Sequence, residues 1–61
     1  MTDFAFSLLA REVMLAMGIT PFDITPHWSE FRLIYRRFYE TGDDATVRDE
    51  IKAAILRLEM N

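Results

Sequence analysis

WSEFRLIYRRFY, residues 28–39, has the clearest periodic pattern in the chain. Aromatic side chains recur at Trp28, Phe31, Tyr35 and Phe38, a spacing that places them along one side of an α-helix. Arginine and glutamate occupy mainly the other positions of the stretch. A helix with so wide an aromatic face has to bury it, and the apolar segments before and after the stretch are the available partners.

The segment before this stretch predicts a first helix, which is capped by Thr2 and Asp3 and stopped by Gly18. Asp3, Ser7 and Arg11 recur every four residues and predict one narrow polar strip. Almost all other positions are apolar, so the helix has more apolar surface than packing on a single neighbour requires. The excess indicates a second contact, either with another helix of the chain or with a second copy of it.

Residues 18–25, GITPFDIT, form the main connection. Thr20, which is followed by a proline, predicts a short turn that it caps and to which Asp23 reaches back. Thr25, also followed by a proline, predicts the start of the central helix. Three apolar side chains predict that the connection folds down over the core: Ile19, Phe22 and Ile24.

A third helix follows the stop signal at Gly42. It is predicted to open at Asp43, Asp44 or Thr46, and Thr46 can form a capping box with Asp49. Its apolar positions repeat with helical spacing: Val47, Ile51, Ala54, Ile55 and Leu58. Because the preceding connection is short, the second and third helices are predicted to be an antiparallel αα-hairpin. The expected fold is therefore all-α, with three helices.

The length of 61 residues predicts one domain, residues 1–61. A chain this short buries a small fraction of its surface, and without cysteine it has neither disulfides nor cysteine zinc sites to stabilise it. With 51% hydrophobic residues, the composition suits either oligomerisation or unusually apolar helix packing, and dimerisation is the favoured prediction. We predict that nine side chains from the three helices form the core or a dimer seam. They are Phe4, Leu8, Leu15, Trp28, Phe31, Phe38, Ile51, Ile55 and Leu58.

Charge and hydropathy argue against several classes of partner. A net charge of −3 argues against a general nucleic-acid-binding surface. The start MTDF is acidic where a secretory signal would be basic. The apolar stretch Phe4–Met17 is too short, and too often interrupted by polar residues, to span a bilayer. The chain is therefore expected to be soluble and cytoplasmic, with no membrane partner.

No catalytic, cofactor-binding or metal-binding set is predicted. His27 is the only histidine, and it lies next to a proline in the first turn of a helix, where a surface or capping role is the commoner one. Asp43 and Asp44 lack the ligand spacing of an EF-hand loop and suit the start of a helix instead. The chain has neither a glycine-rich phosphate loop nor a nucleophile motif. We therefore expect no enzyme activity.

The candidate partner-binding surface is a group of arginines and tyrosines on the central helix, Arg32, Tyr35, Arg36, Arg37 and Tyr39. Arginines one turn apart can grip a carboxylate or a phosphate of a partner. The alternative is a solvated face whose arginine stems cover the aromatic core and whose charges pair with nearby glutamates. The sequence leaves both interpretations open.

The start MTDF, the helix WSEFRLIYRRFYE and the ending KAAILRLEMN resemble the small acidic helical accessory proteins from the early region of lambda-like temperate phages. The resemblance rests on size, composition and hairpin layout. It implies an oligomeric helical protein that modulates host or phage processes through protein contacts, the lysis–lysogeny choice among them.

The leading hypothesis is thus a non-enzymatic protein–protein interaction module or small regulator, acting as a homodimer with an unidentified protein partner. The alternative is a DNA-binding transcriptional regulator with a degenerate helix-turn-helix around Gly18. That motif has a short turn, whereas here eight residues with two prolines separate the helices.

Overall fold

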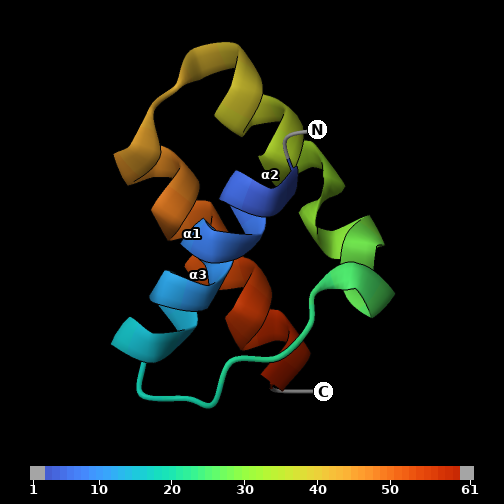
Figure 1. Ribbon diagram of the computed structural model, residues 1–61, viewed down its shortest axis with the longest axis vertical. Helices are drawn as coiled ribbons and strands as arrows, with labels where there is room; N and C mark the ends of the chain where they lie inside the picture. Colours follow the sequence, from blue (N-terminus) through green and yellow to red (C-terminus); the bar gives the residue numbers. More distant parts are fainter. Residues whose placement is uncertain (1–2, 60–61) are drawn as a thin grey trace.

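The computed structural model describes residues 3–59 and contains three α-helices in this range (Figure 1). Helix α1 covers Asp3–Ala16, α2 covers Trp28–Thr41 and α3 covers Asp44–Glu59. A single turn of 3-10 helix, Thr25–His27, leads into α2. The prediction of an all-α fold is confirmed.

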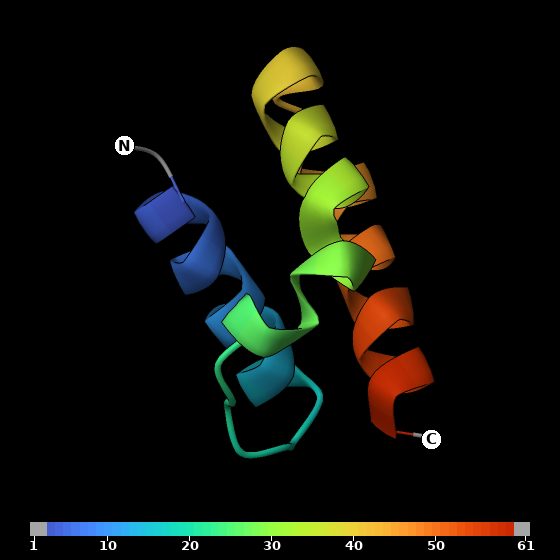
Figure 2. The ribbon, with the colours of Figure 1, turned by 90° about the vertical axis from the view of Figure 1, so that its right-hand side faces the viewer.

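Helices α2 and α3 form an antiparallel hairpin, and α1 packs against both (Figures 1 and 2). Figure 2 shows α1 on one side of the hairpin, with the connection between α1 and α2 closing one end. The predicted hairpin of the second and third helices is therefore also confirmed. Among the helices of residues 3–59, none combines the length and hydrophobicity that a bilayer-spanning segment needs.

Each helix contributes one apolar face to a shared core. Phe31 of α2 and Ile51 and Ile55 of α3, all predicted core positions, are fully buried. Three further predicted positions, Trp28, Phe38 and Leu58, are partly buried against this core. In the described part of the chain the buried residues are Phe6, Leu9, Ala10, Val13, Met14, Ile24, Phe31, Ile34, Val47, Ile51, Ala54 and Ile55.

Phe6 joins α1 to the aromatic face of α2. Its ring is fully buried, and its centroid lies 6.0 Å from that of Trp28, 5.3 Å from that of Tyr35 and 5.8 Å from that of Phe38. The first two contacts are edge to face, the geometry that aromatic quadrupoles favour. The aromatic stripe of α2 therefore packs on α1 of its own chain, which agrees with the core alternative of its prediction as core or dimer seam.

Three predicted core positions of α1 lie on the opposite side of that helix. Phe4 is 73% exposed, Leu8 45% and Leu15 57%. Their helical positions place them away from Phe6 and Val13, which face the core. As core residues of the single chain the three predictions are wrong. As contacts with a second copy they remain a prediction.

Helix α1 ends just before Gly18, as the sequence predicts. Gly18 has a φ of +79°, in the left-handed region that favours glycine. The N–H of Gly18 donates to the carbonyl of Leu15 at 3.0 Å, and the N–H of Ile19 donates to that of Met14 at 3.1 Å. This pair of bonds is a Schellman motif, which satisfies two free carbonyls of the last turn. The predicted cap at the other end, by the side chains of Thr2 and Asp3, lies outside what the structure describes.

The turn between α2 and α3 combines a glycine stop with an aspartate cap. Gly42 has a φ of +67°, and its N–H donates to the Phe38 carbonyl at 3.3 Å. Asp43 then caps α3, because its carboxylate accepts from the backbone N–H of Thr46 at 3.3 Å and from its hydroxyl at 2.8 Å. The predicted capping box of Thr46 with Asp49 is therefore wrong, since Thr46 lies within the first turn and bonds back to Asp43.

The connection is capped at a different residue from the one predicted. Residues 20–23 form no helical turn, so the prediction that Thr20 caps one is wrong. Asp23 instead accepts from the backbone N–H of Thr25 at 3.0 Å and so turns the chain into the 3-10 segment. Thr25 begins that segment, one turn before α2 itself.

The apolar residues of the connection pack against the core. Ile24 is buried, and Ile19 and Phe22 are partly buried against the core cluster. The N–H of Phe22 also contacts the Met14 sulfur at 3.3 Å, which ties the connection to α1. The connection therefore covers the core, as its composition predicts.

Candidate protein-interaction surfaces

The outer face of α1 carries three of the six large hydrophobic side chains that are exposed in the described part of the chain. We define this face by Phe4, Leu8 and Leu15, with Arg11 and Glu12 at its edges. Phe4, Leu8 and Leu15 are separated by four and seven residues, a spacing found in seams between two helices. An exposed apolar stripe of this form is typical of a protein-contact surface.

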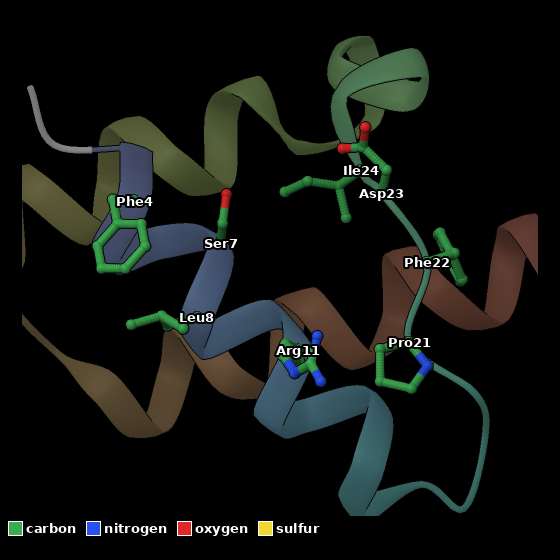
Figure 3. Close-up of a pocket in the computed structure, with 8 residues that line it drawn as sticks. All are labelled: Phe4, Ser7, Leu8, Arg11, Pro21, Phe22, Asp23 and Ile24. Atoms are coloured by element: carbon green, nitrogen blue, oxygen red, sulfur yellow. The ribbon is translucent and has the colours of Figure 1, made fainter.

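Arg11 lies at the edge of the outer face that is turned toward the connection. A shallow groove of 360 Å³ runs along this edge. Figure 3 shows Arg11 and Ser7 on the side of α1 that faces Pro21 and Ile24. Within residues 3–59, Arg11 has no hydrogen bond or ion pair. The residues lining the groove are Phe4, Ser7, Leu8, Arg11, Pro21, Phe22, Asp23 and Ile24.

Glu12 lies at the other edge of the outer face, toward α3. Its Oε1 is 3.2 Å from Nη2 of Arg48, and its side chain remains 62% exposed. A hollow of 260 Å³ on this side is lined by Leu8, Glu12 and Asp44, among others. Leu8 therefore lies between Arg11 at one edge and Glu12 at the other.

The predicted arginine–tyrosine patch is divided between two sides of α2. Arg36 pairs with Glu40 one turn on, with 3.6 Å between Nε and the carboxylate. Arg37 instead pairs with Glu50 of α3, on the hairpin side. Arg32 is exposed and makes no ion pair within the described chain. Only Arg32 and Arg36 thus lie together on an open surface.

The two tyrosines of the patch belong partly to the packing. The ring centroids of Tyr35 and Tyr39 are 5.1 Å apart, and Tyr35 also lies 5.2 Å from Trp28. Tyr35 is half-buried, whereas Tyr39 is 46% exposed. Tyr39 is therefore the tyrosine that a partner of this patch would meet.

Ion pairs between helices are the feature that sequence analysis missed. Each pair joins α3 to one of the other helices, across long sequence separations that no local pattern reveals. The pairs are Arg48–Glu12, Arg37–Glu50 and Arg57–Glu30. They account for three arginines that would otherwise be available to a partner.

No group of three or more His, Cys, Asp or Glu side chains that could hold a metal ion occurs in residues 3–59. His27 is exposed in the 3-10 turn, with its ring edge-on to that of Phe22 at 5.9 Å. Asp23 lies nearby, and the hydrogen bonds from the Thr25 backbone and hydroxyl lower the pKa of its carboxyl group. These groups have local structural roles. Comparison of the chain with protein-family models, curated proteins and solved structures found no match.

Proposed function

We propose that the chain is a non-enzymatic protein-interaction module that acts as a homodimer, with the outer face of α1 as its seam. The observation that supports this is the exposure of Phe4, Leu8 and Leu15 on one face of α1, opposite a core that the three helices already share. Leaving a stripe of large apolar side chains in water is costly, and covering it by association recovers the hydrophobic free energy.

A second copy of the chain is the proposed occupant because the stripe has the spacing of a helix-to-helix seam. Since each chain has its own core, the dimer would form from folded chains. A seam of three apolar side chains buries less surface than a standard interface, which covers about 800 Å² on each partner. The association is therefore expected to depend on concentration in the micromolar range.

The proposed cellular role is regulation through protein contacts, in the manner of the phage accessory proteins that the sequence resembles. In this proposal a further partner contacts Arg32, Arg36 and Tyr39, which the α1 seam leaves uncovered. An acidic segment would suit these two arginines. The proposed location is the cytoplasm.

Sedimentation equilibrium over a concentration series tests the dimer. We expect the mean mass to rise from one chain toward two as concentration increases. Leu15→Ser should keep the protein at one chain without changing its helical circular dichroism, because Leu15 lies outside the core. Leu33→Ser is the matched control, since Leu33 is 61% exposed on α2, outside the seam. A wild-type mass that stays at one chain at every concentration would contradict the proposal.

A further inference from the structure

We infer that the two α1 helices of the dimer are parallel, and that Arg11 of each copy pairs with Glu12 of the other. This inference rests on the proposed homodimer and adds its orientation and the charged pair that fixes it. Charged residues at the edges of a helix seam set partner choice and direction in this way.

The two edges of the outer face carry opposite charges. Consecutive residues are about 100° apart around a helix, so Arg11 and Glu12 lie on either side of the line through Leu8 and Leu15. The surroundings agree with this placement: Arg11 lines the groove beside the connection, and Glu12 lines the hollow on the α3 side. We call these edges basic and acidic after Arg11 and Glu12. Asp23 also lines the groove beside Arg11, and Arg48 of α3 pairs with Glu12.

Symmetry decides which edges meet. A two-fold axis parallel to the helices brings the basic edge of one copy against the acidic edge of the other, on both sides of the seam. Arg11 and Glu12 of the other copy are then offset by one residue, about 1.5 Å along the axis. Phe4, Leu8 and Leu15 each face their own counterpart.

An antiparallel pair brings like edges together instead. The register that keeps all three apolar side chains in the seam sets Phe4 against Leu15 of the other copy. The two Arg11 side chains then lie on the same side, only about 4.5 Å apart along the axis. Like charges this close oppose association. Aligned helix dipoles oppose the parallel pair, but their effect is screened and confined to the end turns.

Both charged groups are available for the pair. Arg11 has no ion pair within residues 3–59. Glu12 uses only Oε1 toward Arg48, which leaves Oε2 to accept from an incoming guanidinium. Two such pairs would form in each dimer.

Cross-linking tests the orientation directly, because the chain has no cysteine of its own. Under mild oxidation, and at a concentration where its reduced form sediments as a dimer, Leu15→Cys should form a disulfide-linked dimer, since the two copies of position 15 face each other in a parallel seam. Leu33→Cys should stay monomeric and controls for random collision. An equimolar mixture of Phe4→Cys and Leu15→Cys chains should give the symmetric products rather than the mixed one. A predominantly mixed product would overturn the parallel arrangement.

Charge exchange tests the Arg11–Glu12 pair by sedimentation. Arg11→Glu and Glu12→Arg should each weaken the dimer by on the order of tenfold, and the double exchange in one chain should restore it. Arg11→Gln should weaken it less. Tighter association of Arg11→Gln than of the wild type would mean that the arginines face each other, and would overturn the inference. Arg48→Ala controls for the intrachain pair that Glu12→Arg also breaks.

The outcomes separate the two proposals. If the wild-type protein does not associate, the homodimer itself fails. If it associates, but position 15 does not cross-link to itself or the double exchange restores nothing, only the parallel seam fails.

Discussion

The rings of Phe6 and Tyr35 meet edge to face, with 5.3 Å between their centroids. Phe6 is the single aromatic side chain with which α1 enters the aromatic face of α2 within the described residues. Because that ring is fully buried, the rotation of α1 about its own axis is set. The same rotation turns Phe4 and Leu8 outward. The rotation of α1 about its axis therefore accounts both for the burial of Phe6 and for the exposed apolar stripe.

Phe6→Ala should be among the most destabilising single substitutions in the chain. Removing a fully buried aromatic ring costs about 3–5 kcal/mol of unfolding free energy, through lost burial and the cavity that remains. A small domain has little reserve beyond this, so we expect a protein that is largely unfolded at 25 °C. Urea unfolding followed by circular dichroism measures the change. Phe4→Ala is the control and should unfold like the wild type at concentrations where both proteins are single chains. Equal losses for the two variants there would contradict the assigned rotation of α1.

The sequence predicts α2 and α3 well and the orientation of α1 poorly, for a physical reason. Helices α2 and α3 each have one apolar stripe, so only one face can be buried. Helix α1 is apolar around most of its circumference, and Phe4 and Phe6 are equally good candidates for the core. Only the shape of the space between the other two helices selects Phe6, and that shape is a property of the assembled fold.

For the candidate surfaces, the sequence predicts ion pairs within one helix but not ion pairs between helices. The spacing of Arg36 and Glu40 reveals their pair, because they are one helical turn apart. The pair of Arg37 with Glu50 depends on how α2 and α3 are aligned, which local spacing does not encode. The sequence therefore groups Arg37 with Arg32 and Arg36, whereas the structure pairs it with Glu50 on the hairpin side of α2.

Arg37→Met should destabilise the fold more than Arg36→Met. Arg37 holds Glu50 across the hairpin, and the other carboxylate oxygen of Glu50, Oε1, is buried without a hydrogen-bond partner. Removing the arginine leaves that acid half-buried and unpaired, which costs more than losing an exposed pair. We expect a loss of about 1 kcal/mol for Arg37→Met and little change for Arg36→Met. Chemical denaturation measures both.

A double substitution separates the ion pair from simple loss of packing. Adding Glu50→Gln to Arg37→Met should recover part of the stability, since the amide carries no unpaired charge. If the double variant is less stable than Arg37→Met alone, the pair is not the source of the effect.

Acid should weaken the start of α3 through Asp43. Hydrogen bonds from the Thr46 hydroxyl, and then from its backbone N–H, lower the pKa of the Asp43 carboxyl group below its ordinary value of 3.8. Because the folded pKa is the lower one, the ionised carboxylate stabilises the fold above pH 3.8, and this contribution is lost as pH falls through the folded pKa. Asp43→Ala should therefore melt at a lower temperature than the wild type at pH 7, with a difference that shrinks below pH 3.8.

The control for this titration is Asp44→Asn, which removes a neighbouring charge that makes no side-chain hydrogen bond in residues 3–59. Its melting temperature should still fall in acid, because Asp43 still caps α3 through Thr46. If Asp43→Ala and the wild type differ equally at pH 7 and pH 3, the cap does not titrate with folding.

Gly42→Ala should destabilise the hairpin through backbone conformation alone. Gly42 has a φ of +67°, and a Cβ at this position would meet no atom within 4 Å. The cost is thus the left-handed conformation itself, about 1–2 kcal/mol for a residue with a Cβ. Gly42→Asn should lose less than the alanine variant, because asparagine tolerates this conformation better. Urea unfolding of the three proteins gives the order glycine, asparagine, alanine, from most to least stable. An alanine variant as stable as the wild type would show that the turn between α2 and α3 does not require a left-handed residue in solution.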